Sequence, residues 1–286
     1  MNTNADTSID AVASRLSRAI TFLFVPGNRP DRFASAWSSK ADVVVLDLEA
    51  SVHPDSKSTA RVEVARWLPS APDHVTALVR LNRPGTEDVA RDIEALAVLR
   101  GFGLMCSGAE LGADIDRLLL EAQGKLPVVL LVETALGVEQ ANQLAALPGV
   151  CRLAFGNMDY ATELNLGPEH WGLIYPSSRI VVASRCAKLP PPIAGVTANI
   201  RDRDAVTREG GFERSLGFGA KMCIHPGQLE WARQVFEPTD EEREWARRIL
   251  EATANSHAVS VDGQMIDRPV IERASRILER ARARTS

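Results

Sequence analysis

The sequence predicts an α/β fold, a closed (β/α)8 TIM barrel with a C-terminal helical appendage. Short apolar runs recur along the chain, and amphipathic stretches of helix length separate them. Strands that alternate with helices form parallel sheets, and eight such strands favour a closed barrel over an open doubly wound sheet. The 286 residues also suit one barrel of about 250 residues with an addition.

The predicted strands are four to seven residues long, which is too short for a buried helix. All are rich in apolar residues, and Val128–Val132 is continuously apolar, as expected of a parallel strand that is buried on both faces. The eight runs are Ile20–Val25, Val43–Leu48, Val75–Leu81, Phe102–Cys106, Val128–Val132, Cys151–Phe155, Ile193–Val196 and Lys221–Ile224. Amphipathic stretches typical of the intervening helices are Ser56–Leu68, Thr86–Leu99 and Val138–Leu147.

The expected organisation has three parts. Residues 1–19 are a polar, partly helical lead-in, residues 20–237 form the barrel, and residues 238–286 form the appendage. After the break at Pro226-Gly227, the pattern predicts helices and one stretch rich in β-formers: Gln228–Phe236, Asp240–Ala254, Ala258–Ile266 and Pro269–Arg284. Because a barrel does not need these residues, we expect them to reach a neighbouring subunit.

The composition argues against several classes of function. A net charge of −4 gives no reason to expect nucleic acid or an anionic membrane as a partner. No apolar run approaches the roughly 18 residues of a membrane span, and the first 20 residues lack the core of a signal peptide, so we expect a cytoplasmic protein. Four widely spaced cysteines indicate thiols in a reducing compartment. Nucleotide-binding glycine motifs and a Gly-x-Ser-x-Gly elbow are absent from the sequence.

Two acids follow neighbouring predicted strands. Glu133 ends the fifth run and precedes Thr134, a predicted helix N-cap, while Asp159 follows the sixth run. In a parallel barrel such positions meet at the mouth, where active sites lie. Two carboxylates with water and substrate oxygens are typical of Mg²⁺ sites. The pattern therefore predicts a magnesium site.

Other polar residues stand at the same ends of strands. Asp47 and Glu49 follow the second run, Arg80 and Asn82 the third, and His225 the eighth. Each has a structural alternative, since Asp47 could be a helix cap or a salt-bridge partner and His225 a core histidine. Their common position at one rim nevertheless favours catalysis.

Six short segments resemble the citrate lyase beta-subunit family, within the HpcH/HpaI aldolases and the malyl- and citramalyl-coenzyme A lyases. These segments are Phe24–Pro30, Val43–Glu49, Val79–Asn82, Val132–Ala135, Gly156–Asp159 and Cys223–Gln228. They occur in the family order, and the resemblance extends from about residue 20 to 280. Each is short, but together they are specific.

The resemblance implies residue roles. Glu133 and Asp159 match magnesium ligands, and Arg80 matches a clamp for the substrate carboxylate and carbonyl, which suits a guanidinium. The remaining expectations are Asp47 and Glu49 beside the metal and its water, Asp267 as a catalytic acid from an adjacent subunit, and Pro26, Gly27, Asn82 and His225 among the substrate-binding residues. Asp267 also has an alternative role, as a cap for the helix that follows it.

The expected function is a magnesium-dependent carbon–carbon lyase for a 3-hydroxyacyl coenzyme A thioester such as citramalyl- or malyl-coenzyme A. We expect a homo-oligomer, a trimer or a hexamer. Two alternatives remain: an aldolase acting on free 2-oxo acids, and a non-catalytic paralogue that binds acyl thioesters. Two departures from the family pattern bear on them, since Cys106 stands where a lysine is usual and Ala50 where an aspartate is usual.

Overall fold

The computed structural model describes residues 3–71, 76–167, 170–253, 259–261 and 264–282. Eight parallel strands close in sequence order into a barrel, which confirms the predicted fold class. The barrel strands are β1 (Thr21–Pro26), β2 (Val43–Asp47), β3 (Thr76–Leu81), β4 (Gly103–Cys106), β5 (Val128–Val132), β6 (Val150–Phe155), β7 (Ile193–Ala194) and β8 (Ala220–Cys223). The predicted boundaries at Val75, Ala254, Ala258 and Arg284 lie outside the described residues.

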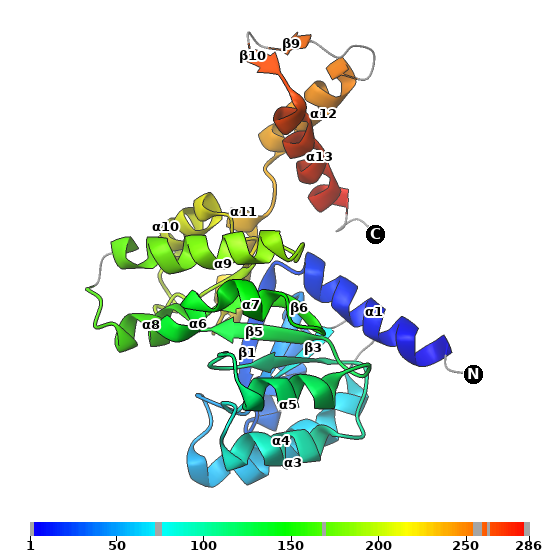
Figure 1. Ribbon diagram of the computed structural model, residues 1–286, viewed down its shortest axis with the longest axis vertical. Helices are drawn as coiled ribbons and strands as arrows, with labels where there is room; N and C mark the ends of the chain where they lie inside the picture. Colours follow the sequence, from blue (N-terminus) through cyan, green and yellow to red (C-terminus); the bar gives the residue numbers. More distant parts are fainter. Residues whose placement is uncertain (1–2, 72–75, 168–169, 254–258, 262–263, 283–286) are drawn as a thin grey trace. The chain divides into compact units, whose positions relative to one another are not determined.

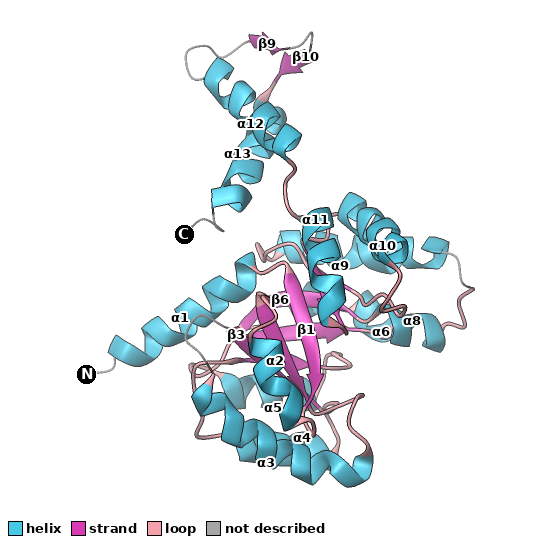
Figure 2. Cartoon of the chain, turned by 180° about the vertical axis from the view of Figure 1, so that it is seen from behind, coloured by secondary structure: helices cyan, strands magenta, loops and turns pink. Residues whose placement is uncertain are grey.

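Helices enclose the barrel strands, as Figures 1 and 2 show. They are α1 (Thr3–Arg18), α2 (Phe33–Trp37), α3 (Lys57–Trp67), α4 (Glu87–Leu96), α5 (Ala113–Ala122), α6 (Ala135–Glu139), α7 (Ala141–Ala145), α8 (Asn157–Glu163), α9 (Ile174–Cys186), α10 (Arg203–Leu216) and α11 (Leu229–Phe236). Short 3-10 turns are η1 (Pro30–Arg32), η2 (Pro54–Ser56), η3 (Leu68–Ser70), η4 (His170–Leu173) and η5 (Pro226–Gln228). Over the described ranges, no helix is both long and apolar enough to cross a membrane.

The two-residue period of the strands decides which side chains point into the barrel. Val43 and Val45 on β2, and Val129 and Leu131 on β5, belong to the buried core inside it. Two residues beyond each pair, the same parity reaches an acid, Asp47 on β2 and Glu133 after β5. The register of β2 with β3 sets Asp47 opposite Arg80. The strands therefore carry their charged residues to the carboxyl end of an otherwise apolar interior.

The opposite end of the barrel is closed by α1. Its residues Val12 and Leu16 are buried in the same core cluster as the barrel interior. Arg152, near the start of β6 and 1% exposed, donates from Nη1 to the carbonyls of Leu16 (2.7 Å) and Ala19 (2.8 Å). These bonds satisfy a buried cation at the end of the first helix. The segment expected as a polar lead-in thus contributes to the core.

Compact packing divides the chain into residues Met1–Val235 and Phe236–Ser286. In the second unit, α12 (Asp240–Thr253) and α13 (Arg268–Arg282) pack through a small core. β9 (Val259–Val261) and β10 (Gln264–Ile266) pair antiparallel between them.

Candidate active site

A cavity of about 280 Å³ opens among the carboxyl ends of the strands. Arg80, Glu133 and Asp159 line it, together with Asp47 and Ala50 from the end of β2 and the loop after it. The remaining lining is mostly apolar. The structure therefore brings the expected metal ligands and the expected substrate clamp to one cavity.

Arg80 is held by two acids from the end of β2. Its Nε and Nη2 donate to the two oxygens of Asp47 at 2.7 and 2.6 Å, and its Nη1 lies 3.3 Å from Oε2 of Glu49. The guanidinium also lies 4.8 Å from the ring centre of Phe24. A two-pronged contact of this kind fixes the plane of the guanidinium as well as its position.

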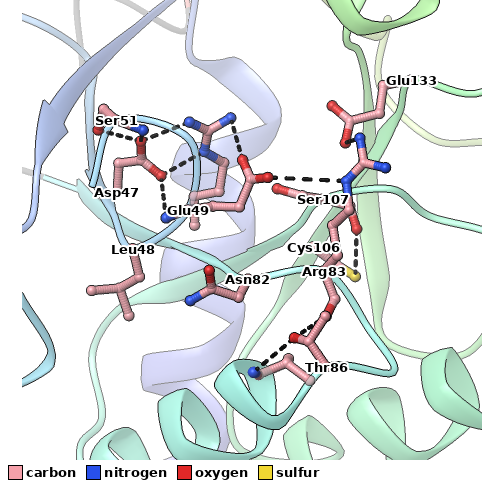
Figure 3. Close-up of polar contacts among 12 residues, drawn as sticks. Asp47, Leu48, Glu49, Ser51, Asn82, Arg83, Thr86, Cys106, Ser107 and Glu133 are labelled. Carbon is pink, nitrogen blue, oxygen red and sulfur yellow. Dashed lines mark hydrogen bonds and ion pairs between the residues drawn. The ribbon is translucent and has the colours of Figure 1, made fainter. Parts of the chain in front are cut away.

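Asp47 is completely buried, and both of its carboxylate oxygens accept hydrogen bonds (Figure 3). Besides Arg80, it accepts hydrogen bonds from the amides of Glu49 (2.8 Å) and Ser51 (2.9 Å) and from the Ser51 hydroxyl. Burial alone would raise the pKa of Asp47, but the charge and hydrogen bonds of Arg80 outweigh burial and lower it. Asp47 is therefore an ionised anchor that orients Arg80 and the loop after β2.

Glu133 is 2% exposed, whereas Asp159 is exposed to the cavity. Burial, and next the negative charge of Asp159, raise the pKa of Glu133 to about 7. Space for Glu133 depends on Gly156, because an added Cβ there would lie 2.4 Å from the Cβ of Glu133 and 2.7 Å from its Oε2. The predicted cap is confirmed, since Thr134 accepts a hydrogen bond from the amide of Gly137 at 3.0 Å at the start of α6.

Arg83, in the loop after β3, is a site residue that the sequence analysis missed. Its Nη2 donates to Oε1 of Glu133 at 3.1 Å, and its Nε lies 4.0 Å from Oε1 of Glu49. Figure 3 shows its side chain extending from the loop toward Glu133. The available signal in the sequence was an arginine shortly after the end of β3. That signal does not give the direction of the side chain, which depends on the conformation of the loop.

The charges at the mouth suit a divalent cation. When all four carboxylates are ionised, they exceed the two guanidinium groups by two negative charges; the side chains counted are Arg80, Arg83, Asp47, Glu49, Glu133 and Asp159. Over the described ranges, no three His, Cys, Asp or Glu side chains form a metal-binding group. Mg²⁺ needs no such cage, because it keeps several waters and commonly takes one or two carboxylates. Glu133 and Asp159 fit that pattern.

Asn82 is buried on the helix side of the mouth rather than lining the cavity. Its amide and its Nδ2 both donate to Oδ2 of Asp92 on α4, at 2.9 and 2.8 Å. Its Oδ1 accepts from Lys57, which also donates to the carbonyls of Leu48 and Glu49 at 2.9 Å. These contacts give Asn82 a role in holding the loop after β2.

Pro26, Gly27 and His225 have local contacts of their own. Pro26 pairs in register with Asp47, and Gly27 donates its amide to the carbonyl of Asp47 at 2.8 Å. A Cβ on Gly27 would meet that carbonyl oxygen at 2.7 Å, so the close approach requires glycine. His225 is exposed and accepts from the amide of Gly227 at 3.0 Å, which caps η5. None of the three lines the cavity described above.

The two departures from the family pattern lie in different places. Ala50 is exposed and lines the cavity, so the missing acid leaves space there. Cys106 is completely buried, while the preceding Met105 belongs to the barrel core, so strand alternation turns Cys106 toward the helices. Burial raises the pKa of the Cys106 thiol. All four cysteines are free.

Asp267 immediately precedes α13 in the second unit. Its Oδ1 accepts a hydrogen bond from the amide of Val270 at 3.2 Å, and its side chain is exposed. The capping role that the sequence left open is therefore present. Its action in a neighbouring subunit stays a prediction, and the turn predicted at Asp262-Gly263 lies outside the described residues.

Known proteins resemble this chain over most of its length. A family model described as HpcH/HpaI aldolase/citrate lyase matches residues 20–226. A citrate lyase subunit beta-like protein of Deinococcus radiodurans is 33% identical over 271 residues, which cover 90% of this chain and 95% of that protein. A (3S)-malyl-CoA thioesterase of Cereibacter sphaeroides is 30% identical over 269 residues, covering 91% of this chain and 94% of the relative.

A solved structure also resembles the chain over nearly its whole length. It is CitE from Mycobacterium tuberculosis in complex with magnesium, acetoacetate and coenzyme A. The similarity has a TM-score of 0.79 at 32% sequence identity and covers 92% of this chain and 98% of CitE.

Proposed function

Because this chain belongs to the HpcH/HpaI aldolase/citrate lyase family, we propose that it is a magnesium-dependent carbon–carbon lyase. The proposed substrate is a 3-hydroxyacyl coenzyme A thioester such as citramalyl- or malyl-coenzyme A. The observation that carries the proposal is the shared cavity of Glu133, Asp159 and Arg80. The magnesium and coenzyme A bound to CitE support the choice of cofactor and substrate class.

The proposed reaction breaks the bond between the α and β carbons of the acyl group. The 3-hydroxyl loses its proton and becomes a carbonyl, while the α carbon gains a proton and leaves as a shorter acyl thioester. Negative charge develops on the thioester oxygen during this step. The divalent cation, held by Glu133 and Asp159, would supply Lewis-acid stabilisation of that charge.

The chain's own residues prepare the site for this charge. Arg80 presents a fixed guanidinium to the cavity, and such preorganised charge is most effective where water is excluded. Asp47 keeps Arg80 in that orientation, while Glu49 approaches both Arg80 and Arg83 and so fixes the rim. Because Asp47 is buried and both of its oxygens already accept hydrogen bonds, its role is positioning rather than proton transfer.

We further propose that Asp267 moves the hydroxyl proton in the mouth of a neighbouring subunit. Its side chain is exposed at the start of α13, where one carboxylate oxygen accepts the capping bond. Most soluble oligomers are closed and symmetric, so each Asp267 would meet an equivalent mouth. The trimer or hexamer expected from the sequence remains part of this proposal.

A second candidate function is thioester hydrolysis, which the similarity to the (3S)-malyl-CoA thioesterase favours. Hydrolysis would leave the α–β carbon bond intact and release free coenzyme A. The same cavity would then hold a water molecule for attack on the thioester carbonyl.

The test is a panel of acyl coenzyme A thioesters and free 2-oxo acids, incubated with magnesium and analysed by product mass. A shorter acyl thioester with a 2-oxo acid supports the lyase. Turnover of free oxo acids alone would indicate an aldolase, and binding without turnover would indicate a non-catalytic paralogue. Glu133→Gln should lose the reaction, whereas Glu87→Gln, which changes an exposed carboxylate on α4, is the matched control.

A further inference from the structure

Arg83 is a partly exposed charged residue that contacts an expected metal ligand, Glu133. Its side chain is 45% exposed, whereas that of its partner Glu133 is 2% exposed. The guanidinium approaches one oxygen of Glu133 and one of Glu49, which come from the ends of β5 and β2. A partly exposed cation therefore already neutralises part of the acidic mouth.

Arg83 differs from Arg80 in how firmly it is held. Arg80 is 12% exposed and makes the two-pronged contact with Asp47. Arg83 makes one hydrogen bond to Glu133, and its approach to Glu49 is long at 4.0 Å. An exposed single contact can be exchanged at small cost, whereas a buried two-pronged contact cannot.

The loop nevertheless keeps Arg83 close to Glu133. The Thr86 hydroxyl donates to the carbonyl of Arg83 at 2.8 Å, which fixes the backbone of the turn. The side chain then passes over Gly108, where an added Cβ would lie 3.3 Å from its Cδ. The side chain thus packs closely over Gly108 at the end of β4, and a side chain at position 108 would have to displace it slightly.

The second oxygen of the Glu133 carboxylate lies on the side of the segment that carries the expected second ligand, Asp159. This oxygen, Oε2, lies against Gly156, at the start of the turn that carries Asp159, while Oε1 receives Arg83. The two oxygens of one carboxylate therefore face a resident cation and the expected metal position. A guanidinium and a divalent cation that share a carboxylate repel each other.

We propose that Arg83 is a resident counter-cation that weakens divalent-metal binding at Glu133 and so sets the metal affinity of the mouth. This inference rests on the proposed metal site and adds a determinant of its strength. Because Arg83 lowers the affinity of the protein for the free ion, oxygen ligands from the substrate contribute a larger share of the metal's binding. The residue acts through Glu133 and does not need to touch the substrate.

The test is titration of the full chain with MgCl₂ by calorimetry, with Mn²⁺ and paramagnetic resonance as a second probe. Arg83→Met should bind Mg²⁺ at least tenfold more tightly. The repulsion between the doubly charged ion and the singly charged guanidinium corresponds to about a tenfold change in affinity even at the dielectric constant of water. Arg83→Lys keeps the charge and should stay within roughly threefold of the wild type. Raising the salt concentration should shrink the effect of Arg83→Met.

Two controls separate this inference from the proposed metal site. Arg91→Met removes an exposed cation on α4 and should leave Mg²⁺ affinity unchanged. Glu133→Gln should lose most Mg²⁺ binding. If Glu133→Gln binds like the wild type, the metal assignment fails and the inference fails with it.

The inference alone fails if the wild type binds Mg²⁺ through Glu133 but Arg83→Met binds it equally or more weakly. It also fails if Arg83→Lys tightens binding as much as Arg83→Met, since the lost charge would then not be the cause. A melting curve for each variant shows that the fold is retained, which the half-exposed position of Arg83 leads us to expect.

Discussion

Replacing Glu133 with glutamine should remove a pH dependence from the stability of the metal-free protein. Burial and the nearby charge of Asp159 raise the pKa of Glu133 from 4.5 to about 7. Below pH 4.5 the folded and unfolded states both hold the proton. Between pH 4.5 and about 7 only the folded state holds it, so the free energy of unfolding falls as the pH rises and then levels off.

The size of this effect follows from the pKa of Glu133. Each pKa unit corresponds to about 1.4 kcal/mol, so ionising Glu133 in the folded chain costs roughly 3 kcal/mol. Because the side chain is 2% exposed, solvent screening reduces this figure little. Glutamine has no carboxyl proton to lose, so the Glu133→Gln protein lacks this pH-dependent contribution to the free energy of unfolding. The difference in free energy of unfolding between the wild type and Glu133→Gln should therefore change by about 2–3 kcal/mol between pH 5 and 8.

The assay is urea unfolding in chelator at pH 5, 6, 7 and 8, followed by circular dichroism. At pH 8, added Mg²⁺ should stabilise the wild type and not Glu133→Gln, because a ligand that binds the folded state stabilises it. Parallel pH profiles for the two proteins would refute the assigned environment of Glu133. Equal stabilisation by Mg²⁺ would refute its role as a ligand.

Three further predictions concern the other parts of the mouth. Arg80→Lys should lose nearly as much kcat/KM as Arg80→Ala, because lysine cannot reproduce the two parallel bonds to Asp47; full activity of the lysine variant would reduce Arg80 to a simple charge. Gly156→Ala should destabilise the protein by about 1–3 kcal/mol and weaken Mg²⁺ binding, since the methyl group overlaps Glu133; unchanged melting and Mg²⁺ titration would contradict the packing. Asp267→Asn and Glu133→Gln oligomers should each be inactive, and mixing them should restore activity. A mixture that stays inactive after verified subunit exchange would exclude a shared Asp267.

The barrel could be predicted from the sequence because buried parallel strands carry a direct signal. Val128–Val132 is a strand with the predicted limits, and the acid that follows it lies at the mouth. The strand period of two then brings Asp47 and Glu133 into one interior. Their neighbourhood in space follows from closure of the barrel.

Side-chain direction beyond the strand ends could not be predicted in the same way. Asn82 follows β3 closely, yet Asp92 and Lys57 hold it on the helix side. Arg83 reaches Glu133 from a loop whose turn directs its side chain over Gly108. These outcomes depend on contacts between distant segments, which periodicity does not encode.

Helix α9 was not among the predicted helical stretches. Residues Ile174–Cys186 form this helix ahead of the seventh strand. Pro176 lies in its first turn, where proline is tolerated, and its β-branched residues lower the helix propensity. Tertiary packing therefore decides the structure of this segment.

The measurement that tests the central claim most directly identifies the bond that is broken. Malyl- and citramalyl-coenzyme A are incubated with the protein, with and without Mg²⁺, and free thiol is quantified beside the products by mass. We predict a Mg²⁺-dependent shorter acyl thioester and an equal amount of 2-oxo acid, with no new thiol. Release of one free thiol for each substrate consumed, with the hydroxy acid intact, would contradict carbon–carbon cleavage and establish hydrolysis instead.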